Sequence, residues 1–199
     1  MRIGAGLLVV LAMCGVGCAG AVTPALRGEY AVVLPLLGAP LTPSHAVNLS
    51  GGILSSGTGA QGGAAVDMRF VVAGDLFRAE AGASVLGFLS PEDRRLPFLI
   101  SEAGLGLIGL SGVKERPFPR GSADNSVDFL NPHAGLALGV PLGRGVALSL
   151  GVSLQYVFRA VGRSDRKDLL LLAISLGFGI LDPRFGPDES VAGFLMKKR

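Results

Sequence analysis

The stretch from Gly145 to Arg159 alternates strictly between two kinds of side chain, and this alternation constrains the fold more than any other feature. A period of two places one set of side chains on one face of a β-strand, whereas a helix would spread the same set over every side. The run is too short to cross a bilayer as a helix, which needs about 20 residues, but long enough as a tilted strand, which needs about 9–11. It therefore predicts a strand of a membrane β-barrel. The apolar even positions are Val146, Leu148, Leu150, Val152, Leu154, Tyr156 and Phe158.

The composition agrees with a barrel of glycine-rich strands. Of 199 residues, 49% are hydrophobic and only 17% are charged, against about 25% charged in soluble domains, so part of the surface is expected to face something other than water. The 31 glycines are dispersed through alternating segments, which is typical of curved strands. A net charge of +3 is too small to predict nucleic-acid binding.

The amino terminus has the charged start, apolar core and small-residue exit of a secretory signal; an anchor helix that is not cleaved is the alternative. Val16-Gly17-Cys18 resembles the lipobox of bacterial lipoproteins, although Gly15 stands where that family usually has leucine. We predict a lipoprotein-type signal peptide over 1–18, with Cys18 acylated by palmitate or a similar fatty acid. Cys14 and an ordinary cleavage after Ala21 are the alternatives. Both cysteines lie in this segment, so no disulfide framework is expected in the mature fold.

After a predicted linker over 19–27, eight alternating segments follow and predict an antiparallel up-and-down barrel over 28–181. The aperiodic, charged segment 112–128 is expected to be its longest loop. The tail 182–199 differs in composition, and Asp188 could cap a short helix there that carries Val191, Phe194 and Leu195. The predicted strands cover about 30–36, 47–53, 64–72, 77–85, 98–111, 130–142, 146–158 and 170–180.

Gly74-Asp75 predicts a tight turn that fixes the register of its two flanking strands. Arg69 then falls opposite Glu80, and an ion pair between them is expected. The second face of the strands is mostly Gly, Ala and Ser, which suits a narrow lumen better than the water-facing wall of a lipocalin-like soluble barrel. Against a membrane barrel, the chain has no Trp and two Tyr for the aromatic girdles. The charged residues expected to form a lumen network are Asp67, Arg69, Arg78, Glu80 and Glu102.

On this pattern the chain resembles the OmpA- and OmpX-like class of small eight-stranded bacterial outer-membrane barrels over 28–181. The resemblance implies the outer membrane of a Gram-negative bacterium, with the outer-membrane lipid as partner. Ala19 after Cys18 implies the same location by resemblance to sorted lipoproteins. The chain departs from the class because it does not end on an aromatic residue of the final strand.

Some barrels of this kind are lipid A acyl hydrolases or transferases that use a histidine, a serine and a carboxylate. His133 is predicted to face inward near Ser149, Ser153 and Glu102, but the closely spaced His and Ser of that family are absent, because residue 135 is glycine. A lumen histidine without catalytic function is therefore the main interpretation of His133. His45 is expected in a loop without a partner. Two separated histidines give no metal-ligand spacing, and no cofactor or metal site is predicted.

The sequence therefore predicts a non-enzymatic outer-membrane β-barrel lipoprotein, lipid-anchored, integral or both, with a structural or surface-interaction role. An envelope protein is a possible partner. Two alternatives stay open: a lipid-modifying acyl hydrolase or transferase with His133 as base, and a periplasm-facing lipoprotein that binds a partner or a lipophilic ligand.

Overall fold

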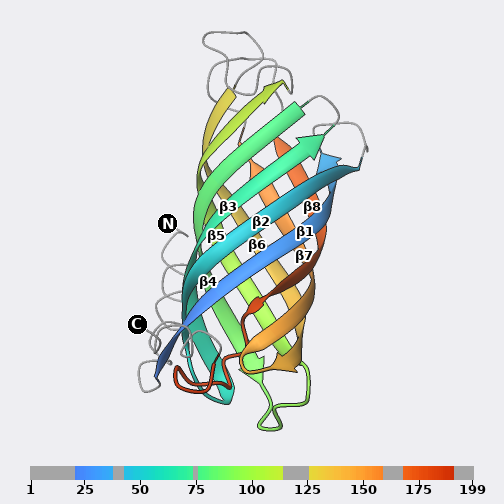
Figure 1. The fold of residues 1–199 in the computed structure, drawn as a ribbon. Coiled ribbons are helices and arrows are strands. Elements are labelled where there is room, and N and C mark those ends of the chain that lie inside the picture. The colour runs from blue at the N-terminus through green and yellow to red at the C-terminus, as the bar shows by residue number, and fades with distance from the viewer. Residues whose placement is uncertain (1–20, 38–42, 74–75, 114–125, 159–167, 191–199) are drawn as a thin grey trace, which may run out of the picture.

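The structure, a computed structural model, describes residues 21–37, 43–73, 76–113, 126–158 and 168–190. They form a closed antiparallel barrel in which each strand pairs with the next along the chain and the last pairs with the first (Figure 1). The predicted eight-stranded up-and-down barrel is confirmed. The strands are β1 (Val22–Leu37), β2 (Ser44–Ser55), β3 (Gly59–Ala73), β4 (Leu76–Ser90), β5 (Phe98–Val113), β6 (Ser126–Gly143), β7 (Val146–Val157) and β8 (Leu169–Ile180).

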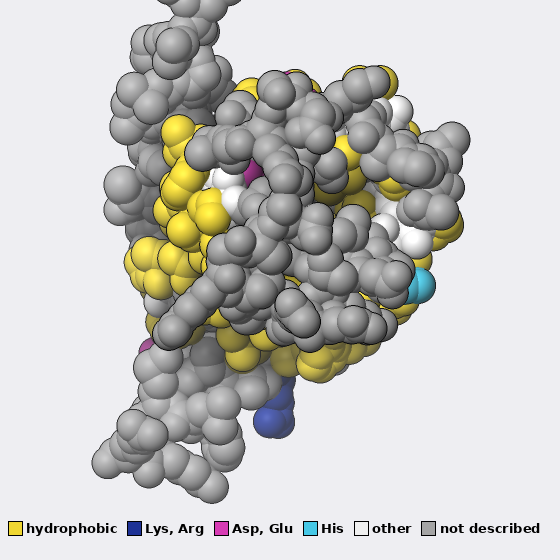
Figure 2. Space-filling view, turned by 90° about the horizontal axis from the view of Figure 1, so that it is seen from above, with side chains coloured by type: hydrophobic (Ala, Val, Ile, Leu, Met, Phe, Trp, Pro, Cys, Tyr) yellow, Lys and Arg dark blue, Asp and Glu magenta, His cyan; other side chains and the backbone are white. Residues whose placement is uncertain are grey.

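The alternation of the sequence becomes an apolar outer wall and a lumen of small and polar side chains. In β7, Leu150 is 60% exposed on the wall, whereas the neighbouring Ser149 is 1% exposed in the lumen. Seen from above, hydrophobic side chains are visible along the edge of the barrel where the grey residues do not cover it (Figure 2). The predicted register is also confirmed, because Arg69 pairs with Glu80 across β3 and β4. Among the described residues, none belongs to a helix long and apolar enough to cross a membrane.

The two ends of the barrel differ. The turn end, lowest in Figure 1, holds the start of β1, the end of β8 and the connections 56–58, 91–97 and 144–145. The loop end holds the other four connections. Between β6 and β7, Gly143, Arg144 and Gly145 all adopt positive φ, at 104°, 51° and 82°. Glycine adopts positive φ at no steric cost, and this turn keeps the apolar faces of both strands on the wall.

The linker predicted over 19–27 is wrong from residue 22 onward, because β1 begins at Val22. Thr23 and Arg27 are buried in the lumen, while Val22 and Leu26 are more than half exposed on the wall. The physical reason is that the alternation of β1 already starts here, with small and charged residues on its inner face. Cys18 lies outside the described residues.

The predicted loop 112–128 is shorter than expected, because β5 continues to Val113 and β6 begins at Ser126. The alternation in this region is interrupted by an extra residue in each strand. Leu107 forms a β-bulge against β4, and both Leu107 and Ile108 are exposed on the wall. Leu130 lies opposite Leu107 and has a positive φ of 56°. A bulge reverses the parity of the residues beyond it, which hides the strand character of 126–129 in the sequence.

Apolar side chains and a terminal segment close the turn end of the lumen. The residues after β8, here called the C-terminal cap (181–190), cover this opening. Arg184 is bound to Asp182 at 2.8 Å and donates to the backbone oxygens of Asp93 and Leu96 at 2.8 and 2.9 Å. The described part of the cap consists of turns, and the helix predicted around Val191 to Leu195 lies outside the described residues. The apolar plug inside consists of Ala25, Leu54, Ala65, Leu86, Phe88, Phe98, Ile100, Ala147 and Leu181.

Candidate functional site

Charged side chains meet in the lumen beyond the apolar plug. Each occupies an inward position of its strand, so the period of two that makes the wall apolar also gathers these groups inside. We call this set the lumen charge layer. Its charged members among the described residues are Arg27 and Glu29 of β1, Asp67 and Arg69 of β3, Arg78 and Glu80 of β4, Glu102 of β5, and Asp128 of β6.

One half of the layer is a compact hydrogen-bonded network around Arg78. Its guanidinium group binds both carboxylate oxygens of Asp128, at 2.5 and 2.8 Å, and one oxygen of Glu80 at 2.5 Å. Asn131 donates to both carboxylates. Such bidentate, fully paired charges are the arrangement in which burial is tolerated. Asp128 was missed in the sequence because the Leu130 bulge reverses its parity.

Arg69 and Glu80 are not joined directly, although they are paired in the register. Gln155 of β7 lies between them: Arg69 Nη1 donates to Gln155 Oε1 at 2.7 Å, and Gln155 Nε2 donates to Glu80 Oε1 at 2.6 Å. The expected direct ion pair is therefore wrong. The physical reason is that the long Arg69 side chain reaches across the lumen to an amide that serves both charges at once.

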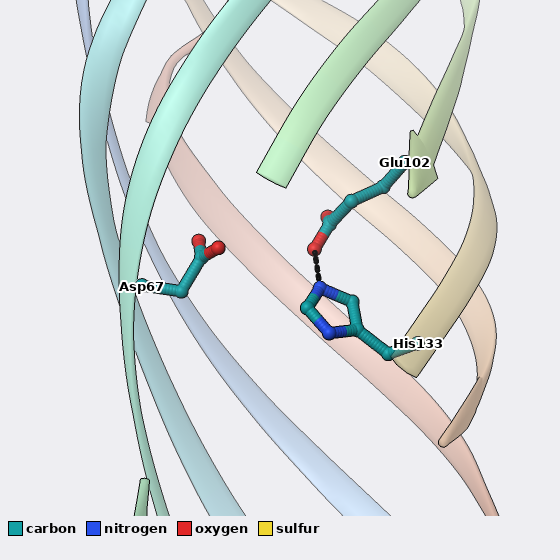
Figure 3. A group of neighbouring side chains, drawn as sticks. All are labelled: Asp67, Glu102 and His133. Carbon is teal, nitrogen blue, oxygen red and sulfur yellow. Dashed lines mark ion pairs between the residues drawn. The ribbon is translucent and has the colours of Figure 1, made fainter. Parts of the chain in front are cut away.

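The other half of the layer is centred on Glu102. Arg27 donates to Glu102 Oε2 and lies 3.4 Å from Glu29. His133 Nε2 lies 3.3 Å from Glu102 Oε1, and Asp67 of β3 directs its carboxylate toward both residues (Figure 3). One ligand-type atom from each of Asp67, Glu102 and His133 lies within 4.8 Å of the others. We call these three residues the lumen triad.

The polar atoms of the lumen triad are poorly satisfied, in contrast to the Arg78 network. Neither carboxylate oxygen of Asp67 and neither ring nitrogen of His133 makes a hydrogen bond of good geometry. The contact between His133 Nε2 and Glu102 Oε1 is an ion pair only when the imidazole is protonated. Both side chains are more than nine-tenths buried. The sequence predicts no metal-ligand spacing here, because the three residues come from β3, β5 and β6 and only closure of the barrel brings them together.

The placement of His133 differs from that of a catalytic base. A nucleophile and its base lie within hydrogen-bond reach of one another, but His133 accepts no bond from a serine, and the Ser149 hydroxyl has no partner at all.

The loop position predicted for His45 is wrong, because His45 belongs to β2. On the outer wall its Nδ1 lies 2.5 Å from the Tyr30 hydroxyl, with the two rings stacked.

The fold is that of the small outer-membrane β-barrels. No protein-family model matches the chain, and no curated protein sequence matches it. The crystal structure of Neisserial surface protein A (NspA) is similar, with TM-score 0.56 and 16% identity over 79% of this chain and 97% of that chain. The outer membrane enzyme PagL has TM-score 0.43 and 13% identity over 77% and 98% of the two chains. Ail of Yersinia pestis has TM-score 0.36 and 10% identity over 78% and 98%.

Proposed function

We propose that the chain is an integral outer-membrane β-barrel with a structural or surface-interaction role and no catalytic activity. The observation that carries the proposal is the wall, where large apolar side chains stand exposed on all eight strands. Soluble monomers rarely expose contiguous apolar patches of more than a few hundred Å². In a lipid bilayer these apolar side chains would contact hydrocarbon and not water. The closed sheet also leaves no strand edge with unpaired backbone groups inside the bilayer.

The lumen supports a role other than transport or catalysis. The apolar plug and the C-terminal cap fill one end, and charged pairs fill the middle. Beside them, two cavities of ≈ 30 Å³ each are lined in part by residues of the charge layer. A cavity of this volume can hold a water molecule but is too small for a substrate. Interaction with a partner would then use the loop end, where connections rather than sheet meet the surroundings.

Fractionation of a Gram-negative host that expresses the full chain tests the membrane assignment. We expect the protein in outer membranes after alkaline carbonate extraction, with a gel mobility that changes on heating. The Cys18→Ala variant is extracted in parallel, because acyl chains on Cys18 would keep even a peripheral protein in the pellet. Release of this variant into the carbonate supernatant would contradict integral insertion and favour the periplasm-facing lipoprotein.

We further propose that Cys18 carries a lipid anchor. Only three residues separate Cys18 from Val22, where β1 begins at the turn end, so acyl chains on Cys18 could enter the leaflet beside that rim. Metabolic labelling with a fatty-acid analogue should be lost in Cys18→Ala and retained in the matched variant Cys14→Ala. Labelling that survives the loss of Cys18 would contradict this choice of residue.

The acyl hydrolase or transferase alternative finds no support in the position of His133, which is buried in the lumen away from the lipid-facing wall. Mass spectrometry of lipid A from cells with and without the protein tests the non-catalytic proposal. We expect identical lipid A spectra, and a difference in acylation that depends on His133 would contradict it.

A further inference from the structure

Within the part of the chain that the structure describes, the positive and negative charges of the lumen charge layer are not equal in number. Among its described residues three arginines face five carboxylates, so two negative charges remain if His133 is neutral. Uncompensated charge in a low-dielectric interior is expensive. A group that carries two positive charges would remove the imbalance.

Among the described residues, nine buried side-chain polar atoms make no hydrogen bond, and four of the nine belong to the lumen triad. Asp67 is 7% exposed and His133 is 6% exposed, yet four of their polar atoms make no hydrogen bond. Buried polar groups are nearly always paired, and a buried carboxylate without a donor or cation is the costliest exception. The charge imbalance and the missing partners therefore point to the same place.

The spacing of the triad suits a metal ion. Metal–ligand bonds of about 2.0–2.2 Å in a tetrahedral zinc site separate neighbouring ligand atoms by about 3.3–3.6 Å. His133 Nε2 and Glu102 Oε1 are 3.3 Å apart, and the 4.8 Å limit on all three atoms leaves small side-chain rotations to bring Asp67 to the same spacing. We propose that Asp67, Glu102 and His133 bind a divalent zinc ion inside the barrel.

Neighbouring residues hold these ligands in place. Arg27 binds Glu102 Oε2, which leaves Oε1 directed at His133 and fixes the carboxylate, as outer-shell partners of metal ligands do. Gly104 of β5 pairs with His133 of β6. A Cβ at residue 104 would lie 2.6 Å from His133 Nε2, so the glycine provides the space that the imidazole occupies.

The donor set selects the kind of ion. One imidazole nitrogen and two carboxylates fit zinc, whereas calcium requires six to eight oxygen ligands and magnesium keeps an octahedral shell of oxygens. The ion neutralises the two uncompensated charges and joins β3, β5 and β6 across the lumen. Its role is to stabilise the barrel.

Metal content of the full chain, folded in detergent with excess zinc and then dialysed, tests the proposal. We expect about one zinc per chain, an affinity lowered at least about 100-fold in Asp67→Asn and in His133→Gln, and near-natural binding in Glu29→Gln. The last variant is the matched control, because Glu29 is a lumen carboxylate beside Arg27 that lies outside the triad. Magnesium or calcium at the same concentration should not displace the zinc.

Thermal unfolding separates loss of zinc from loss of fold. Zinc should raise the melting temperature of the natural chain and of Glu29→Gln but not that of Asp67→Asn. Without metal, Asp67→Asn should melt higher than the natural chain, because it removes an unpaired buried charge. A folded natural chain that retains no zinc, or triad variants that bind zinc as the natural chain does, would overturn the proposal.

Discussion

At the scale of single residues, the lumen shows that opposite charges in register need not form the interaction that stabilises a barrel. Arg69 and Glu80 are cross-strand partners in the β3–β4 register, but their side chains are connected only by hydrogen bonds to the Gln155 amide between them. Arg78 and Asp128 come from strands that are not neighbours, and yet they form the bidentate pair. An arginine side chain is long enough to bind a partner on a strand across the lumen. Strand alternation predicts that the side chain faces the lumen, but it does not predict which partner the side chain binds.

Double-mutant cycles measured by unfolding in liposomes should separate these two cases. The Arg78→Ala/Asp128→Ala cycle is expected to show a coupling free energy of about 3 kcal/mol, because removing one partner leaves the other charge buried. The Arg69→Ala/Glu80→Ala cycle should show about 1 kcal/mol, as expected for charges that share a neutral amide. Equal couplings in the two cycles would contradict the arrangement described for Gln155.

At the scale of strands, the sequence predicts faces well and interruptions badly. Alternation identifies all eight strands and the inward side of Asp67, Glu80 and His133, because each position simply follows the parity of its strand. The paired extra residues Leu107 and Leu130 could not be predicted, since both are apolar and fit either parity. For the same reason the inward position of Asp128 could not be predicted. The lumen triad could not be predicted either, because it depends on which side chains meet in the lumen once the barrel has closed.

Deletion of the extra residues tests this account of β5 and β6. Removing Leu107 and Leu130 together should preserve the folded, heat-modifiable barrel, because the inward residues on both sides then alternate regularly and keep their partners. Removing only one of them shifts one strand against the other and moves Asp128 away from Arg78. The single deletions should therefore fold less than the double deletion, and the opposite order would contradict the bulge assignment.

The turn between β6 and β7 offers a second test at this scale. Arg144 adopts φ 51° at an exposed position, where asparagine is tolerated better than arginine. Arg144→Asn should stabilise the barrel by about 0.5 kcal/mol, measured as a shift in the urea midpoint at constant slope. A destabilised variant would indicate that the Arg144 side chain makes a favourable contact at the membrane surface.

At the scale of the whole molecule, the wall and the lumen exchange the usual roles of surface and core. The outer wall of the barrel is apolar, while the residues of the lumen charge layer lie inside among small residues and glycines. This inversion is why the composition indicates a membrane protein, although none of the described residues belongs to a helix that could cross a membrane. It also makes the effect of a charge depend on which side of the sheet carries it.

A charge placed on the wall should reveal the bilayer directly. Leu150→Arg puts a cation on the exposed face of β7 and should cost about 2–4 kcal/mol in liposomes if it lies near the midplane. Leu96→Arg is the matched control, because Leu96 is similarly exposed but lies in the 91–97 connection, where about 0–1 kcal/mol is expected. Equal, small effects at both residues would contradict membrane insertion.

The C-terminal cap has a consequence for the lifetime of the folded barrel. Arg184 bonds to backbone oxygens about 90 positions earlier in the chain, so these contacts require that β8 has already closed against β1. Interactions that form after the folding transition state slow unfolding and leave the folding rate almost unchanged. Arg184→Ala should therefore accelerate unfolding in stopped-flow or manual-mixing experiments while folding proceeds at the natural rate. The lifetime of the folded barrel would then depend on the height of the barrier to unfolding as much as on the free energy of unfolding.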